Sequence, residues 1–329
     1  MGMYTKKYSG AFILCPVPPG GHPASVTIIA DNVPTDFPGD RADSRGITIS
    51  AELPAEEFRI VACVPPLHRR YDKVSQLIEF VEVQRMLGVD LIVVYNHSVS
   101  ARVGKVLDSM SHHGVVHVIP WELPFDAYLG GGYTNIHYFG QLAAVNDCLY
   151  RYRSRTQYII NVDMDEYIVP SLEGNLWLWV NKQLTLNPAA SAFILKSYLL
   201  YSYLPDHKDY FPTQEAAKKY QLVTLLKTNR TEETLPFRIR PKYIYDPKRV
   251  VSAGIHNIWG HRRNFKSQYI PSDDCTVYHY RNAKVTPNPN GSVTDTYFHS
   301  FQYDIVQRIE SRWRTIRREM NLTFSDLNH

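Results

Sequence analysis

The sequence predicts an α/β fold whose core is a doubly wound, mostly parallel, Rossmann-like sheet. Two observations carry this prediction. From residue 58 onward, short apolar runs typical of buried strands alternate with stretches in which apolar residues recur at helical spacing. The links between them are short, so successive strands are joined through helices, which requires parallel strands and right-handed crossovers. A content of 44% hydrophobic and 21% charged residues is ordinary for a folded protein and excludes wholesale disorder.

The predicted elements follow one another in a regular order. Asp72 is the candidate cap of the first helix, and Gly88 is expected to end it. In the less regular second half, we expect residues 220–226 to form a strand and residues 227–290 to be rich in loops. The expected strands are 58–64, 91–95, 115–119, 158–162 and 192–195, and the expected helices are 72–88, 99–110, 138–152 and 301–320.

The first 57 residues differ from the rest of the chain. Apolar, β-branched pieces at 11–14 and 25–30 are separated by turn-rich stretches. We therefore expect residues 1–57 to form a small β-rich N-terminal extension without chemistry of its own. Residues 58–329 then form the domain that carries the function.

The charge of the chain excludes some classes of protein. The formal net charge of +4 is too mild for a nucleic-acid-binding protein. No uninterrupted apolar run approaches the roughly 18 to 20 residues of a membrane span. The positive charge is unevenly spread, because residues 238–266 hold eight Lys and Arg against one acid, Asp246. This segment is either a solvated loop or a basic cover over the ligand crevice.

Cysteines and glycosylation sequons leave the compartment open. The N-terminus lacks the apolar core of a signal peptide, so the chain is either cytosolic or the luminal part of a longer protein. The four cysteines match no zinc spacing, and they are either free thiols or paired. They are Cys15, Cys63, Cys148 and Cys275, and the sequons begin at Asn96, Asn229, Asn290 and Asn321.

An acidic stretch follows the strand predicted at 158–162. Asp163 and Asp165 alternate along an extended segment, so both carboxylates can face one hard cation, and Glu166 comes next. In a doubly wound sheet this position opens onto the ligand crevice. Mg²⁺ or Mn²⁺ held by such carboxylates keeps open positions for phosphate oxygens. The alternative is an acidic strand end or helix cap without metal.

An ordered series of short sequence motifs covers roughly residues 58–282. The motifs are Val64-Pro65-Pro66-Leu67, Leu87-Gly88-Val89, Val94-Tyr95-Asn96, Trp121-Glu122-Leu123-Pro124, Gly140-Gln141, Asn146-Asp147-Cys148-Leu149-Tyr150-Arg151, the run Val162 to Pro170, Arg240-Pro241, Gly254-Ile255-His256-Asn257 and Tyr278-His279-Tyr280-Arg281. This series resembles glycosyltransferase family 92. The resemblance implies a catalytic domain with the GT-A fold, in which a nucleotide-binding parallel half-sheet is followed by Asp-x-Asp.

The resemblance implies an activity and a compartment. The reaction is an inverting transfer of galactose from UDP-galactose, with formation of a β-linkage, expected to be β-1,4. The acceptor is a sugar, galactose or core fucose, of a glycoprotein N-glycan. Members of this family are typically type II membrane proteins of the Golgi. Under this reading the chain is the luminal part, with its membrane anchor absent from the sequence.

The resemblance also implies roles in metal binding and proton transfer. Asp165 would be the direct ligand of Mn²⁺ or Mg²⁺, and Asp163 would contact ribose or reach the metal through water. His279 is the first choice for a further ligand and His256 the second, while each is otherwise a hydrogen-bonded core histidine. Inversion needs a general base. The candidates for it are Glu166, Asp206 and Asp209.

Binding of the donor and of sugar rings is assigned to separate sets of residues. Sugars stack on aromatic faces, and Trp259, beside His256 and Asn257, is the candidate for that contact. Gly130 to Tyr133 lacks the pattern of a phosphate loop. The candidates for the donor nucleotide are Pro65, Leu67, Tyr95, Asn96, Gln141, Asp147 and Asp163.

Two other functions stay open. A metal-dependent phosphohydrolase would use the same Asp163 and Asp165, although such enzymes usually cluster more His and Asp ligands than this strand end supplies. A non-catalytic glycan-binding relative of the same fold would keep the architecture without the reaction.

Overall fold

A computed structural model describes residues 54–123, 128–130, 133–171, 174–281 and 291–327, with short pieces at 10, 12–13, 15–17, 19–21, 23–26 and 47–48. The chain divides into two compact units, one of which contains Glu56–His329 while the other is Ala11–Ala55. In the shorter unit, strands β1 (Ser25–Val26) and β2 (Ile47–Thr48) pair antiparallel. Most of the predicted N-terminal extension lies outside the described residues.

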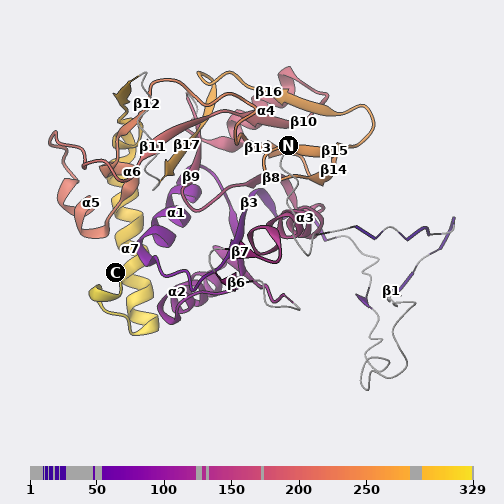
Figure 1. Ribbon diagram of the computed structural model, residues 1–329, viewed down its shortest axis with the longest axis horizontal. Coiled ribbons are helices and arrows are strands. Elements are labelled where there is room, and N and C mark those ends of the chain that lie inside the picture. The colour runs from indigo at the N-terminus through magenta and orange to yellow at the C-terminus, as the bar shows by residue number, and fades with distance from the viewer. Residues whose placement is uncertain are drawn as a thin grey trace. The chain divides into compact units, whose positions relative to one another are not determined.

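A seven-stranded sheet forms the centre of the larger unit (Figure 1). Its strands, in spatial order, are β16 (Lys266–Tyr269), β10 (Ala190–Leu195), β13 (Lys242–Tyr245), β8 (Thr156–Asn161), β3 (Phe58–Leu67), β4 (Leu91–Asn96) and β5 (Val116–Pro120). Strands β8, β3, β4 and β5 are parallel, and β13 runs antiparallel between β8 and β10. The predicted α/β class with a doubly wound, mostly parallel sheet is confirmed, and its arrangement is GT-A-like.

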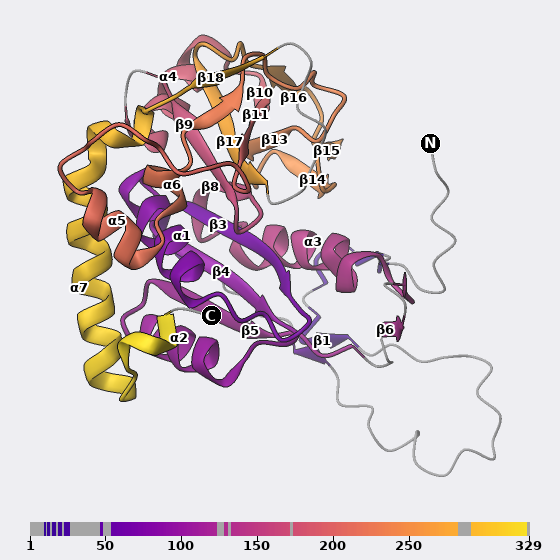
Figure 2. The ribbon, with the colours of Figure 1, turned by 60° about the vertical axis from the view of Figure 1, so that its left-hand side comes forward.

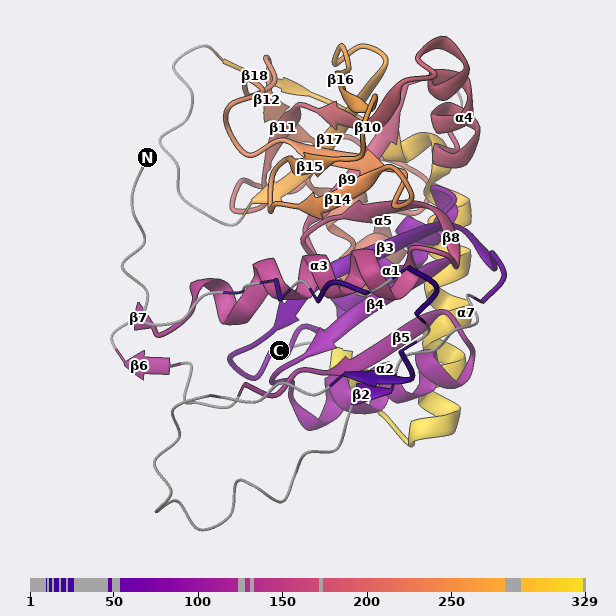
Figure 3. The ribbon, with the colours of Figure 1, turned by 90° about the vertical axis from the view of Figure 1, so that its right-hand side faces the viewer.

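Helices cover both faces of this sheet. Side chains alternate along β3, and they are apolar on both faces, so each face packs against helices. Ile60 and Ala62 point to the face covered by α1 (Val74–Met86), α2 (Ala101–His112) and α7 (Gln302–Met320), and α7 packs against both other helices (Figure 2). The intervening residues of β3 point to the opposite face, where α3 (Gln141–Tyr152) contacts β3 and β8 (Figure 3).

A second, five-stranded sheet brings distant segments of the chain to the acidic stretch. Its antiparallel pair, β9 and β17, places His279 directly opposite Glu166 in the register. In spatial order the strands are β18 (Ser292–Thr294), β12 (Asn229–Thr231), β11 (Ser197–Tyr201), β17 (Cys275–Arg281) and β9 (Glu166–Pro170).

The remaining elements are short. Strands β14 and β15 form an antiparallel hairpin, and so do β6 and β7. Their bounds are β14 (Val250–Ala253), β15 (Ile258–His261), β6 (Tyr128–Gly130) and β7 (Tyr133–Thr134). The other helices are α4 (Leu176–Leu186), α5 (Gln214–Tyr220), α6 (Val223–Leu226), η1 (His137–Gly140), η2 (Tyr297–Phe301) and η3 (Phe324–Leu327).

Three local predictions are wrong. Residues 220–226 do not form a strand: Tyr220 ends α5, and residues 223–226 form α6, whose first amides, at Val223 and Thr224, donate hydrogen bonds to the buried Glu79 carboxylate. Asp72 does not cap α1, because its carboxylate accepts hydrogen bonds from Arg102 and Ser100. Residues 227–281 contain strands β12 to β17, whose three to seven residues are mostly too few for an alternation signal.

Two further features bear on the open alternatives. Cys63 of β3 and Cys148 of α3 form a buried disulfide, so paired cysteines replace free thiols at these positions. Within the part of the chain that the structure describes, no helix is both long and apolar enough to cross a bilayer.

Candidate active site

A cavity of about 890 Å³ opens at the carboxyl ends of β3 and β8, where a doubly wound sheet holds its ligands. Segments from six places in the sequence form most of its wall. They are the end of β3 (Val64 to His68), the start of α3 with η1 (His137, Tyr138, Gln141), the turn from β8 to β9 (Asp163 to Glu166), the segments 238–240 and 255–259, and the end of β17 (His279, Arg281).

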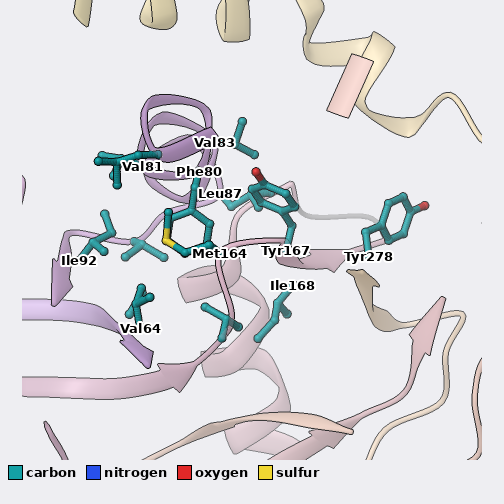
Figure 4. Close-up of a cluster of buried hydrophobic side chains, with 14 of the residues drawn as sticks. Val64, Phe80, Val81, Val83, Leu87, Ile92, Met164, Tyr167, Ile168 and Tyr278 are labelled. Carbon is teal, nitrogen blue, oxygen red and sulfur yellow. The ribbon is translucent and has the colours of Figure 1, made fainter. Parts of the chain in front are cut away.

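Two hydrogen bonds between its first and last residues close the acidic turn between β8 and β9. The backbone amide of Asp163 donates to Glu166 Oε2 at 2.8 Å, and the amide of Glu166 donates to the Asp163 carbonyl at 3.1 Å. Met164, between the two aspartates, belongs to the same apolar cluster as Val64 (Figure 4), and it also lines the cavity. The alternation predicted from the sequence thus leaves Asp163 and Asp165 partly exposed on the cavity side, at 39% and 31% of their side-chain surface.

A buried lysine lies directly beneath these acids. Lys242 begins β13 and is 1% exposed, and its ammonium lies 2.9 Å from Asp163 Oδ2 and 2.7 Å from Glu166 Oε2. Burial alone would lower the pKa of Lys242, but the two carboxylates raise it above its ordinary value. Burial alone would raise the pKa of Asp163, but Lys242 lowers it below its ordinary value. Lys242 and Asp163 therefore stay ionised as a pair, whereas burial raises the pKa of Glu166 against the opposing effect of Lys242.

His279 reaches the same cluster from β17. It is 8% exposed, its Nε2 lies 3.7 Å from Asp165 Oδ2, and its Nδ1 lies 3.5 Å from Glu166 Oε1. Burial alone would lower the pKa of His279, but the carboxylates of Asp165 and Glu166 raise it. Asp163, Asp165 and His279, which the sequence predicts as metal ligands, line the same cavity, and His279 lies beside Asp165.

The donor atoms fit a hard or borderline divalent cation, because carboxylate oxygen suits Mg²⁺ and imidazole nitrogen extends the choice to Mn²⁺. One oxygen of Asp163 is already bonded to Lys242, which leaves its second oxygen and the carboxylate of Asp165 toward the cavity. Among the described residues, no group of three or more His, Cys, Asp or Glu is arranged so that it could hold a metal ion. An ion here would thus take its remaining ligands from water or from phosphate oxygens.

The opposite wall is the β14–β15 hairpin, which α3 and β13 hold in place. The Asn146 side chain of α3 bonds both backbone groups of Ala253, at 2.8 and 2.9 Å. Trp259 is 64% exposed and lies against Gly254 so closely that a Cβ there would come within 2.2 Å of the indole Nε1. An aromatic face is thereby presented to the cavity.

His256 lines the cavity beside this face. Its Nδ1 is buried and has no hydrogen-bond partner among the described residues. Burial lowers the pKa of His256 to about 4, and the positive charge of Lys242 acts in the same direction. The imidazole is therefore neutral near pH 7. Asn257 lines the cavity next to it.

Three guanidinium groups line the cavity near the acids. Arg238 and Arg240 belong to the basic segment that the sequence singled out, and Arg281 ends β17. None of them forms an ion pair with another residue that the structure describes. The wall of the cavity thus joins an acidic cluster to unpaired positive charge.

The other predicted residues divide into two groups. Pro65, Leu67 and Gln141 line the cavity. Tyr95, Asn96 and Asp147 do not, and the Tyr95 hydroxyl donates to Asp147 Oδ2 at 2.7 Å in a separate network that includes Arg151.

The general-base candidates are also separated. Glu166 lines the cavity, where it is 1% exposed and bound to Lys242. Asp206 and Asp209 lie outside the cavity lining, and Asp206 pairs with Lys227 at 2.8 Å. The central residue that sequence reasoning missed as a site residue is Lys242. The only sequence signal for Lys242 was a charged residue at the start of a buried strand, directly after the motif Arg240-Pro241.

Two relatives of this chain among the curated proteins are named β-1,4-galactosyltransferases. A β-1,4-galactosyltransferase of Caenorhabditis elegans is 26% identical over 233 residues, which are 69% of this chain and 49% of that protein. A galactan β-1,4-galactosyltransferase of Arabidopsis thaliana is 31% identical over 199 residues, which are 56% of this chain and 33% of that protein. The chain thus spans at most about half the length of these curated relatives.

One solved structure with a similar arrangement is the UDP-GlcNAc complex of S. aureus TarS. Its sequence is 12% identical, the match covers 77% of this chain and 66% of that chain, and the TM-score is 0.34. Another is the complex of glucosyl-3-phosphoglycerate synthase of Mycobacterium tuberculosis with Mn²⁺, UDP and glucosyl-3-phosphoglycerate. Its sequence is 9% identical, the match covers 78% of this chain and 80% of that chain, and the TM-score is 0.32. The family model for glycosyltransferase family 92 matches residues 58–324. The chain therefore belongs to glycosyltransferase family 92.

Proposed function

We propose that this glycosyltransferase is an inverting, metal-dependent enzyme that transfers galactose from UDP-galactose and forms a β-1,4 linkage. One observation carries the proposal: a single cavity places the carboxylates of Asp163 and Asp165 near unpaired guanidinium groups. This pairing of charges suits a diphosphate bound together with a cation. The choice of galactose and of the linkage follows the two relatives named β-1,4-galactosyltransferases.

Asp165, His279 and the oxygen of Asp163 that Lys242 leaves unbonded would hold Mn²⁺ or Mg²⁺. When bound, the ion supplies Lewis-acid stabilisation of the negative charge that builds on the UDP leaving group. Lys242 fixes the orientation of Asp163, and its charge offsets part of the repulsion among the three acids. The ligand set is thereby arranged before the donor arrives, which lowers the reorganisation that catalysis requires.

The guanidinium groups of Arg238, Arg240 and Arg281 are assigned to the phosphate oxygens of the donor. Planar guanidinium groups bind phosphate through paired N–H donors, so these side chains add geometric selectivity as well as charge. Trp259 offers the stacking surface for a sugar ring, with His256 and Asn257 as polar neighbours. Pro65, Leu67 and Gln141 are assigned to the nucleotide.

Glu166 is the proposed general base among the three acids considered, because it alone lines the cavity. Inversion in a single displacement requires this group to accept the proton of the attacking hydroxyl while the bond to UDP breaks. Its Oε1 is the oxygen not bonded to Lys242. Asp206 and Asp209 are expected to tolerate replacement by Asn.

The proposed acceptor is galactose or core fucose of a glycoprotein N-glycan, and the proposed compartment is the Golgi lumen. The disulfide between Cys63 and Cys148 supports an oxidising compartment, because cytosolic thiols are kept reduced. The sequons at Asn96, Asn229 and Asn321 would be usable there.

The test is release of UDP from UDP-galactose in the presence of Mn²⁺, with and without N-glycans that end in galactose or carry core fucose. We expect release that depends on the acceptor and falls about 100-fold or more in Asp165→Asn. Asp108→Asn, on the exposed face of α2, is the matched control. Acceptor-independent cleavage of the diphosphate would instead indicate a phosphohydrolase. Glycan binding without turnover of any nucleotide sugar would indicate a binding protein.

A further inference from the structure

A second cavity, of about 500 Å³, lies between α7, α5 and η3, and it shares no lining residue with the first. Figures 1 and 2 both show α5 beside the C-terminal part of the chain, and α5 contacts α7. Its floor is aromatic, since Tyr220 and Trp313 are 5% and 3% exposed and Phe324 packs against both rings. Its rim is formed by charged side chains.

The rim carries four cations against one acid. Arg314, Arg317 and Arg318 of α7 and Lys219 of α5 line the cavity, and Glu310 is the acid among its lining residues. None of these four cations forms an ion pair with another described residue. Like charges three and four residues apart on a helix repel each other, so this arrangement lowers helix stability slightly.

Other arginines of the same helix behave differently. Arg308 pairs with Asp304 at 2.8 Å, and Arg312 pairs with the buried Glu82 at 2.6 Å. The helix dipole favours basic residues in the last turn, which accounts for Arg317 and Arg318 individually. It does not account for their convergence with a lysine from another helix around a cavity.

A buried donor without a partner provides an independent observation. Trp313 lines this cavity, and its indole Nε1 is buried without a hydrogen-bond acceptor among the described residues. A buried polar group left unpaired costs about 1–3 kcal/mol, so such groups normally have an acceptor. An acceptor oxygen supplied by a ligand would satisfy this donor and neutralise the cations at the same time.

We propose that this cavity binds a tetrahedral oxyanion, a phosphate or a sulfate, presented by a small ligand or a sugar. Guanidinium groups suit such an anion because they donate paired N–H bonds to its oxygens. The aromatic floor gives a ring attached to the anion an apolar surface to contact. The site is separate from the proposed catalytic cavity and does not depend on the assignment of the reaction.

The experiment is a titration with inorganic phosphate, inorganic sulfate and a sulfated heparin disaccharide, followed by calorimetry and by tryptophan fluorescence. N-glycans are removed enzymatically first, because Asn321 lines the cavity and begins a sequon. We expect saturable binding with a 1:1 stoichiometry that weakens at least tenfold in the double variant Arg314→Gln/Arg318→Gln. Arg308→Gln, on the same helix but outside the cavity, should bind within twofold of the wild type.

The three ligands also separate the sources of the anion. Tighter binding of the disaccharide than of free sulfate would show that the aromatic floor contributes, and equal binding would assign the site to the free anion. Trp313→Phe keeps an aromatic ring and removes the donor, and it should weaken binding. Absence of binding up to about 10 mM of all three ligands would overturn the proposal, and so would equal affinity in the double variant. Because no readout is catalytic, failure here leaves the proposed function untouched.

Discussion

Replacing Lys242 by methionine should destabilise the protein strongly, because methionine keeps the apolar stem and removes the charge. The ammonium lies 2.7 Å from Glu166 Oε2, and the two side chains are only 2% and 1% exposed. Removing one partner of a buried pair leaves the other charge without compensation, which costs about 3–5 kcal/mol. We expect the free energy of unfolding of Lys242→Met to fall by about this amount in urea titrations followed by circular dichroism.

Two further variants make the test specific to burial. The double variant Lys242→Met/Glu166→Gln carries neither charge and should recover most of the loss, because a neutral amide is far less costly to bury than a carboxylate. Lys248→Met is the matched control, since its ammonium lies 2.6 Å from Glu56 Oε2 with both side chains exposed, at 51% and 36%. An exposed pair contributes about 0–1 kcal/mol. Equal losses in Lys242→Met and Lys248→Met would refute the reasoning.

Three other predictions concern the packing of Trp259 in the cavity wall, the buried acid Glu79 and the disulfide. In Gly254→Ala the new Cβ displaces the Trp259 indole, so the KM for the sugar that stacks there should rise about tenfold in steady-state assays. Burial raises the pKa of Glu79 from 4.5 to about 7, so Glu79 contributes about 3 kcal/mol of stability below pH 4.5, and this contribution is lost as the pH rises through 7. The difference in unfolding free energy between the wild type and Glu79→Gln should shift by that amount across this range. Opening the disulfide between Cys63 and Cys148, which are 85 residues apart, should cost about 4.5 kcal/mol in urea titrations with and without reductant.

Each of these predictions has its own control. Gly104→Ala, where an added Cβ meets nothing within 4 Å, should leave the KM unchanged. The groups that interact with Glu79 include the phenols of Tyr167 and Tyr280, whose pKa values burial raises, so they do not titrate in this range. A pH-independent difference between wild type and Glu79→Gln would contradict the burial argument. Reductant should have no effect on a Cys63→Ala/Cys148→Ala variant, and an effect there would contradict the assignment to this disulfide.

The parallel half of the fold was predictable because its signals are local. Strands β3, β4 and β8 are buried on both faces and therefore read as continuous apolar runs. Asp163 and Asp165 could be placed because they directly follow such a run, at the edge where ligands bind. These predictions needed no knowledge of which distant segments come together.

The remainder depended on contacts between distant segments. Lys242 is separated from Asp163 by 79 residues, and antiparallel insertion of β13 beside β8 brings them together. The α6 helix forms where the sequence suggested a strand, because the carboxylate of Glu79, 145 residues before Thr224, binds its first amides. The disulfide likewise joins β3 to a helix that starts far along the chain. Local propensity carries no information on such pairings.

The central claim is that the cluster of Asp163 and Asp165 holds a cation together with the diphosphate of the donor. The most direct test is calorimetric titration of UDP into the wild type and into Asp165→Asn, with Mn²⁺ and after removal of divalent ions with a chelator. The account predicts that UDP binds the wild type at least tenfold more tightly with Mn²⁺, and that Asp165→Asn abolishes this enhancement. Equal UDP affinity with and without Mn²⁺ in both proteins would contradict it.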